Sequence, residues 1–160
     1  MERYQKAVDL WQSYKIESAE KLDKHLENFR ILFAYNSGKI ENEEITYPVT
    51  REIFENSMVA GYTGNPRAII EQQNQKLCYE ALKQKIIDQI PISVELIKEI
   101  HCILTSGTYD ERRYIINEER PGEFKKHDYI TGVYEVGSSV EDTPQDLAEL
   151  ISEVNEYGKR

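Results

Sequence analysis

Hydrophobic residues recur at helical spacing along most of the chain, and short polar or turn-forming stretches separate these segments. The pattern predicts helices over about 2–14, 18–42, 50–60, 66–88, 93–106 and 143–156. In the second helix, one continuous apolar stripe is formed by Leu22, Leu26, Phe29 and Phe33. Towards the C-terminus, β-forming residues broken by two glycines predict one β-hairpin over about 122–140. The expected fold class is therefore mainly α, with one hairpin.

Cap and turn residues set the expected helix boundaries. N-caps are predicted at Thr50, Asn65, Ser93 and Thr143, whose side chains can accept an early backbone N–H. Gly61 is expected to end the third helix. Pro48 favours an extended conformation for Tyr47, because a proline disfavours the helical region in the residue before it. The polar and charged stretch 108–120 is typical of a surface loop.

Length and charge narrow the choice of function. The 160 residues suffice for one domain with a core and are too few to predict two. They carry 29 Asp and Glu against 20 Lys and Arg, a net charge of -9. A nucleic-acid partner is not expected, because a phosphate-backbone binder needs a basic face. No secretory signal and no apolar run of membrane-spanning length is visible, which favours a cytoplasmic protein without membrane contact.

The cysteines and histidines predict neither a disulfide nor a metal site. Cys78 and Cys102 each lie in a helical pattern among apolar neighbours, outside any Cys-x-x-Cys or Cys/His cluster. We expect both to be reduced, buried thiols. His25 has no second histidine or cysteine at a ligand spacing. His101 is expected to be a hydrogen-bonded structural residue and not a catalyst.

The segment 37–42 closes the long apolar helix with polar residues at helical spacing. Ser37 and Glu41 are four positions apart, so their hydroxyl and carboxylate lie on one helix face. Gly38 lies within this turn, where glycine costs about 1 kcal/mol relative to alanine. Spacing alone leaves two interpretations open, a functional pair of side chains or a plain helix end, because Ser, Gly and Asn also gather where helices stop.

The string Ser37-x-x-x-Glu41-Asn42 resembles the inhibitory motif of Fic (Fido) family proteins, Ser/Thr-x-x-x-Glu-Gly/Asn. That family transfers AMP from ATP to a hydroxyl group of a target protein. The resemblance implies that Glu41 pairs with an arginine that would otherwise hold the ATP γ-phosphate, while Ser37 fixes the turn and Asn42 ends it. Such a block is physically reasonable, because a guanidinium held by a carboxylate cannot also clamp a phosphate.

Later segments follow the order of the same family. The helix around Asn74 and the segment around His101 resemble family segments. The string Gly122-Glu123-Phe124-Lys125 is similar to the family's Gly-Glu-Tyr-Arg, with two conservative departures. The expected hairpin resembles the flap that covers the family's active site and pairs main chain to main chain with the target. The docking residues implied for this flap are Tyr129, Ile130, Thr131, Gly132 and Val133.

The family's catalytic signature, His-Pro-Phe-x-Asp/Glu-Gly-Asn-Gly-Arg, does not occur in the chain, so no catalytic residue is predicted. In the family this signature follows the helix that here starts near Thr143. The chain therefore resembles the N-terminal part of a single Fic-like domain, an incomplete helical bundle. Residues 1–49 correspond to the N-terminal helices with the inhibitory motif, and residues 50–160 to the start of the core.

Two functions follow from the resemblance. In the first, the chain is the regulatory and target-docking part of an adenylyltransferase and is inactive without the signature. In the second, it is a stand-alone, antitoxin-like module that places Glu41 against the arginine of a separate Fic protein. A helical domain with neither role is the third interpretation.

Ligands and partners are implied in the same way. ATP and Mg²⁺ are implied for the complete family, along with a target protein, and neither ligand is expected to bind tightly to this chain alone. A core without its central helices exposes apolar surface, so we expect self-association, which would favour the first function. A well-behaved monomer would favour the second.

Overall fold

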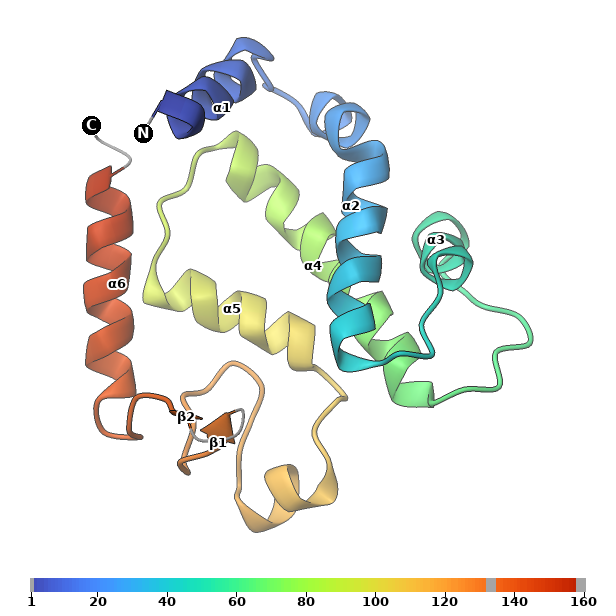
Figure 1. The fold of residues 1–160 in the computed structure, drawn as a ribbon, viewed down its shortest axis with the longest axis vertical. Coiled ribbons are helices and arrows are strands. Elements are labelled where there is room, and N and C mark those ends of the chain that lie inside the picture. The colour runs from blue at the N-terminus through green and yellow to red at the C-terminus, as the bar shows by residue number, and fades with distance from the viewer. Residues whose placement is uncertain (1, 132–134, 158–160) are drawn as a thin grey trace.

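The computed structural model describes residues 2–131 and 135–157, which form a mainly helical fold (Figure 1). The helices are α1 (Glu2–Ser13), α2 (Ala19–Glu41), α3 (Tyr47–Asn56), α4 (Pro66–Ile87), α5 (Val94–Thr105) and α6 (Thr143–Tyr157). A π-helical turn, η1 (Arg112–Ile116), and two strands, β1 (Ile130–Thr131) and β2 (Glu135–Val136), lie between α5 and α6. The predicted mainly α class is confirmed for this part of the chain.

Helices α2 to α6 pack against one another. Both α3 and α4 contact α2, α5 contacts α4, and α6 contacts α5. In Figure 1, α4 and α5 accordingly lie between α2 on one side of the molecule and α6 on the other. A buried apolar cluster of Ile31, Ala34 and Phe54, with Tyr47 packed against it, joins α2 to α3. The C-terminal half of α2 is therefore held between α3 and α4.

Two of the predicted helix starts are confirmed in detail. The Asn65 side chain accepts a hydrogen bond from the Arg67 backbone N–H at 3.0 Å, and the Ser93 hydroxyl accepts one from the Leu96 N–H at 3.1 Å. Pro66 occupies the first position of α4, where a backbone N–H has no partner within the helix in any case. Local side-chain chemistry therefore fixes where α4 and α5 begin.

The predicted boundaries of α3 are wrong at both ends. The helix begins at Tyr47, so Thr50 is not its cap but a fully buried residue inside its first turn. Tyr47 is helical and not extended, and Pro48 lies in the first turn of the helix. A proline fits there because the first turn needs no N–H from that position. The helix ends before Ser57, which adopts a left-handed conformation with φ 61, and Gly61 lies beyond it in the connecting loop.

Two further expectations need correction. The polar stretch 108–120 is not simply a surface loop, because it contains η1 and two buried side chains, Thr108 and Glu119. These polar groups can be buried because hydrogen bonds satisfy them, and composition alone cannot reveal such pairing. Of the two cysteines, Cys78 is buried as predicted but Cys102 is exposed.

Strands β1 and β2 pair antiparallel, with Ile130 opposite Val136 and Thr131 opposite Glu135. A hairpin flap with the extent expected, about 122–140, is not seen. Most of residues 122–129 form turns and irregular backbone, since Gly122 has a positive φ of 82 and the preceding proline offers no N–H for a ladder. The predicted docking residues Gly132 and Val133 lie outside the described residues.

A partly buried charge network ties α2 to α4. Asp23 accepts hydrogen bonds from the Tyr79 hydroxyl at 2.7 Å, the Lys83 ammonium at 2.9 Å and the Arg30 guanidinium at 3.2 Å. Burial alone would raise the pKa of Asp23, but the hydrogen bonds from Lys83 and Tyr79 lower it overall. An ionised carboxylate therefore joins the two helices.

Asp23→Asn is expected to lower the free energy of unfolding by about 1 kcal/mol at neutral pH, because one charged acceptor serves three donors at a partly solvated site. Urea denaturation followed by circular dichroism measures this change. Glu27→Gln, at an exposed position of the same helix, is the control and should have little effect. Equal losses in the two variants would contradict a stabilising role for the network.

Candidate functional site

The segment 37–42 forms the last turn of α2 and its C-cap. The helix ends at Glu41, and the Asn42 backbone N–H donates to the Gly38 carbonyl at 2.8 Å. The Asn42 side-chain oxygen accepts from the Glu44 backbone N–H at 2.9 Å, which supports the turn that follows the helix. The predicted helix end at Asn42 is confirmed. The Ser37 hydroxyl accepts a hydrogen bond from Gln75 of α4 at 3.4 Å.

A polar cavity of about 310 Å³ lies beside this turn. Its lining includes Ser37 and Glu41 from α2, Arg67 and Gln75 from α4, and Arg113 from η1. These side chains are far apart in the sequence, and they meet because the end of α2, the start of α4 and the segment after α5 converge there. With Glu71, Thr105 and Thr108, which also line it, the cavity combines hydroxyl groups, two carboxylates and two guanidinium groups.

Both arginines of this cavity already have carboxylate partners. Arg67 Nε lies 2.8 Å from Glu71 Oε1 on the next turn of α4, and Arg113 Nε lies 2.9 Å from Glu119 Oε2. Glu41 is exposed and forms no ion pair with any residue in the ranges 2–131 and 135–157. Its carboxylate is therefore available to a cationic group from elsewhere.

Gly38 is required by the close packing of α2 on α4. A Cβ atom at position 38 would lie 1.8 Å from Gln72 Nε2. Gln72 is fully buried, where its Nε2 donates to the Ala34 carbonyl at 3.3 Å and its Oε1 accepts from the Thr50 hydroxyl at 3.0 Å. The Gln72 side chain occupies the space that a Cβ would need, which explains why a glycine stands in this turn despite its low helix propensity.

A buried carboxylate connects η1 to the residue that precedes β1. Glu119 is 2 % exposed, accepts from the Tyr129 hydroxyl at 2.6 Å and pairs with Arg113. The Tyr129 hydroxyl also accepts from the Asn117 amide at 3.0 Å. Burial alone would raise the pKa of Glu119, but the hydrogen bonds from Tyr129 and Arg113 lower it overall. The ionised Glu119 carboxylate therefore links Tyr129, which precedes β1, to Arg113 of η1.

Gly122 lies tightly against α5. Its N–H donates to His101 Nδ1 at 3.0 Å, so His101 is hydrogen-bonded as predicted. A Cβ atom at position 122 would lie 2.8 Å from Cys102 Cβ, and the left-handed backbone also favours glycine there. Burial lowers the pKa of His101, and the nearby Arg113 charge lowers it further. A neutral ring keeps Nδ1 able to accept, which gives His101 a structural role.

The other residues of the segment 122–125 anchor the chain before β1. The Phe124 ring centroid lies 5.2 Å from Lys98 Nζ, a cation–π contact with α5. Lys125 donates to the Ser138 carbonyl on the far side of the strand pair. Glu123 is exposed. The segment that resembles the family's Gly-Glu-Tyr-Arg therefore contacts α5 and the chain after β2, and it does not line the polar cavity.

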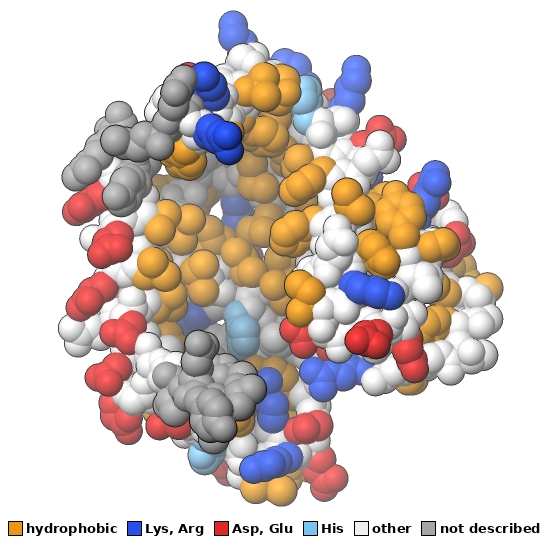
Figure 2. Space-filling view, in the orientation of Figure 1, with side chains coloured by type: hydrophobic (Ala, Val, Ile, Leu, Met, Phe, Trp, Pro, Cys, Tyr) orange, Lys and Arg blue, Asp and Glu red, His pale blue; other side chains and the backbone are white. Residues whose placement is uncertain are grey.

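An apolar groove of about 320 Å³ adjoins the polar cavity and shares Gln75 and Leu104 with it. Apolar lining residues from three helices are Leu26, Phe29, Phe33, Cys78, Leu82 and Ile100. Phe29 is 59 % exposed and Phe33 57 %, unusually high values for phenylalanine. Figure 2 shows hydrophobic side chains gathered around a hollow over α2, α4, α5 and α6. This face is therefore a candidate contact surface.

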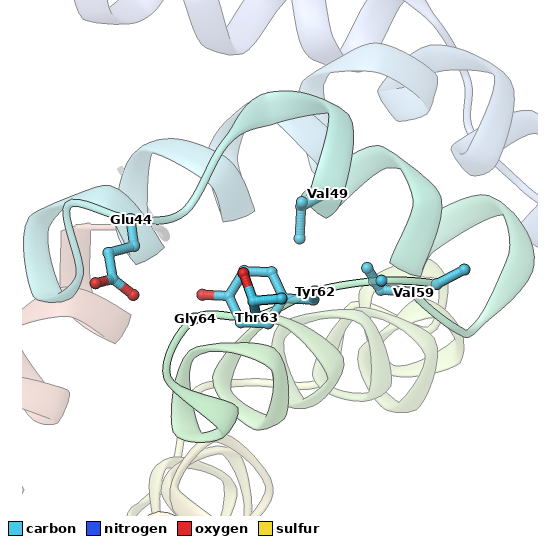
Figure 3. A pocket seen from close by; sticks show the side chains of 8 residues that line it. Glu44, Val49, Val59, Tyr62, Thr63 and Gly64 are labelled. Atoms are coloured by element: carbon cyan, nitrogen blue, oxygen red, sulfur yellow. The ribbon is translucent and has the colours of Figure 1, made fainter.

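A third cavity, of about 430 Å³, lies between the start of α3 and the loop that follows it (Figure 3). It is lined by Glu44, Val49 and residues 59–64. The Tyr62 hydroxyl points toward Glu44 but has no hydrogen-bond partner among the described residues, and burial raises the pKa of this tyrosine. Glu44 instead accepts from the Asn65 backbone N–H at 3.3 Å. With one acidic side chain and no basic one, this cavity offers no acid–base pair.

Sequence reasoning missed five residues around the site, namely Arg67, Gln72, Gln75, Arg113 and Glu119. The two glutamines stand in a run of six polar residues, 71–76, so the sequence gives no signal that separates them from solvated neighbours. Nothing in the charged stretch around Arg113 and Glu119 separates these residues from their solvated neighbours.

Comparisons with known proteins establish the fold. No protein-family model and no curated protein matches the chain. Among solved structures, the chain is similar to a Fic domain-containing signaling protein from Bacteroides thetaiotaomicron, with a TM-score of 0.70 and 22% sequence identity. The similarity covers 97% of this chain and 56% of the other, so the 160 residues span little more than half of that protein's length. The chain therefore has a Fic-like helical fold, as the resemblance predicted.

Two further observations concern metal binding and membrane crossing. In the part of the chain that the structure describes, no group of three or more His, Cys, Asp and Glu side chains is arranged to hold a metal ion. Within the same residues, every helix is either too short or too polar to cross a lipid bilayer.

Proposed function

We propose that the chain is the regulatory and target-docking part of a Fic-like protein adenylyltransferase, with Glu41 as its inhibitory carboxylate. The observation that carries the proposal is the state of Glu41, which is exposed, lines the polar cavity and has no cationic partner among the described residues. An arginine that entered this cavity would form a charge-assisted pair with Glu41 and could not also bind a phosphate. Ser37 and Asn42 would hold the turn that presents it.

We do not expect the residues present to hold Mg-ATP tightly by themselves. The guanidinium groups of Arg67 and Arg113 are engaged by Glu71 and Glu119, and the lining of the cavity contains no glycine-rich turn with free backbone amides. The His-Pro-Phe signature, which would supply the base and the phosphate cradle, is not in the 160 residues. The role proposed for this chain is therefore control of nucleotide binding and not the transfer chemistry itself.

The strand pair is the proposed docking point for the target. A target segment that adds to the edge of β1 would bind through main-chain hydrogen bonds, with little demand on its sequence. Tyr129 immediately precedes β1, and its hydroxyl is held by Glu119 and Asn117. This anchoring would keep the edge in place while the target binds.

A second candidate is an antitoxin-like role, in which Glu41 acts on the arginine of a separate Fic protein. The exposure of Glu41 supports both functions equally. The apolar groove supports the first, because half-exposed phenylalanines beside the cavity favour burial under further protein.

Transfer of labelled AMP to protein tests the proposal. The chain is expressed as the longest reading frame that contains it, and ATP labelled at the α-phosphate is added with Mg²⁺ and a cell extract as a source of targets. Glu41→Gly is expected to increase protein labelling by about tenfold or more, the range of a typical regulatory coupling. Glu43→Gly, at an exposed position two residues later, is the control and should match the wild type.

Equal labelling by the wild type and Glu41→Gly would contradict the proposal. A different outcome supports the second candidate: no labelling by either protein, but suppression of an added Fic enzyme by the wild-type chain and not by Glu41→Gly.

A further inference from the structure

We infer that Gln72 and Gln75 of α4 are positioning residues that set where the last turn of α2 presents Glu41. The inference rests on the proposed inhibitory role of Glu41 and extends it from the motif to the helix behind it. The two glutamines are three positions apart and therefore lie on one side of α4. That side faces the turn formed by Ser37 and Gly38.

Gln72 makes hydrogen bonds to α2 and α3, two of the helices that pack against α4. Its Nε2 donates to the Ala34 carbonyl of α2, and its Oε1 accepts from the Thr50 hydroxyl of α3. Both Gln72 and Thr50 are fully buried, so solvent does not compete for either bond in this arrangement of the helices. A buried amide that is satisfied at both ends favours one relative arrangement of the elements it joins.

The same amide lies directly against the turn that carries the motif. The space for a Cβ at Gly38 is filled by Gln72 Nε2, at 1.8 Å. The Gly38 carbonyl accepts the Asn42 backbone N–H that caps the helix. One turn further along α4, Gln75 donates to the Ser37 hydroxyl. The backbone from 37 to 42 is therefore located by α4, and Glu41 is located with it.

An apolar side chain of similar size would fill the same volume but would not fix the position of the turn. Methionine is the closest match to glutamine in length and flexibility. Gln72→Met should therefore preserve most of the packing while it removes the two hydrogen bonds. The turn should then open more often, whereas the start of α2, which Asp23 ties to α4, should not.

Hydrogen exchange of the 160-residue chain, read by mass spectrometry of its peptides, tests the inference. In Gln72→Met, the amides of residues 37–42 are expected to exchange about tenfold faster than in the wild type, since local opening costs less. Peptides from residues 19–30 should keep their wild-type rates. The control is Gln84→Met, at an exposed position of the same helix, which should change neither region. Unchanged exchange at 37–42, or an equal increase along all of α2, would overturn the inference.

Gln75→Ala provides a second variant that removes a single 3.4 Å hydrogen bond from a half-buried position. A smaller increase confined to residues 37–42 is expected from it. No increase would contradict the part of the inference that concerns Gln75.

The AMP-transfer assay separates this inference from the proposed function. If the inference and the proposed function are both correct, Gln72→Met alone raises labelling. Added to Glu41→Gly, it has no further effect on labelling. Faster exchange at 37–42 without any response of labelling to Glu41→Gly would leave the positioning correct and the proposed function wrong. The inference alone would be overturned if Glu41→Gly raised labelling while Gln72→Met changed neither labelling nor hydrogen exchange at 37–42. The proposed function would then stand.

Discussion

Glu119→Gln is expected to lower the free energy of unfolding by about 2 kcal/mol at neutral pH. The carboxylate is almost completely buried and serves as acceptor for both Tyr129 and Arg113. A neutral amide leaves the Arg113 charge without its partner at a site where solvent reaches the guanidinium only in part. The substitution should also loosen the base of β1, because Tyr129 loses an ionised acceptor.

This effect depends on pH with a defined sign. The folded-state pKa of Glu119 lies below its ordinary value of 4.5, so the ionised group stabilises the folded state. The contribution is complete above pH 4.5 and is lost as the pH falls through the lowered folded-state value. The difference between the wild type and Glu119→Gln should therefore be largest at neutral pH and shrink at about pH 3.

Urea denaturation at the two pH values measures both effects. Glu123→Gln is the matched control, because Glu123 pairs with Lys126 at 3.2 Å but is about half exposed. Its loss of stability should be well under that of Glu119→Gln. If the difference in unfolding free energy between the wild type and Glu119→Gln were the same at about pH 3 as at neutral pH, the role assigned to the ionised Glu119 would be contradicted.

Phe33→Glu is expected to weaken self-association of the 160-residue chain by at least about tenfold. A phenylalanine buries roughly 150–250 Å² when it is covered, and Phe29 and Phe33 each expose more than half of their surface in the groove. A stable interface buries roughly 800 Å² per partner, so these two rings would form a substantial part of it. A carboxylate placed there would have to lose its hydration on association, which costs more than 1.4 kcal/mol, the equivalent of tenfold.

Sedimentation equilibrium over a range of protein concentrations measures this association. Leu77→Glu is the control, because Leu77 is also 57 % exposed but lies outside the residues that line the groove. It should leave the association constant close to that of the wild type. A wild-type chain that is monomeric at every concentration would contradict the prediction and would favour the antitoxin-like role.

Periodicity and caps were sufficient to predict most of the helical framework. The stripe that contains Leu22 lies on α2, and Asn65 and Ser93 begin their helices as predicted. These features depend on neighbours within one or two turns, which the sequence displays directly. The start of α3 was missed because Pro48 fits both an extended entry and a first helical turn. Packing against α2 decides between them.

The site depends on contacts that no local pattern contains. The resemblance points to Ser37, Glu41 and Asn42 as candidates, but the reason for Gly38 lies in Gln72, on another helix. Likewise, Glu119 looks like any solvated acid in the sequence and is buried because Tyr129 and Arg113 satisfy it. Long-range pairing of polar groups is the information that composition and spacing lack.

Binding of Mg-ATP, measured by titration calorimetry, tests the regulatory role of Glu41 most directly, since it requires no knowledge of the target. The proteins compared are the longest reading frame that contains the chain, the same frame with Glu41→Gly, and the 160 residues alone. We predict that Glu41→Gly tightens ATP binding by about tenfold in the long frame, because an arginine is released to the phosphate, and that the 160 residues alone bind no ATP measurably. The same ATP affinity with and without Glu41 in the long frame would contradict the account and leave the motif as a helix end.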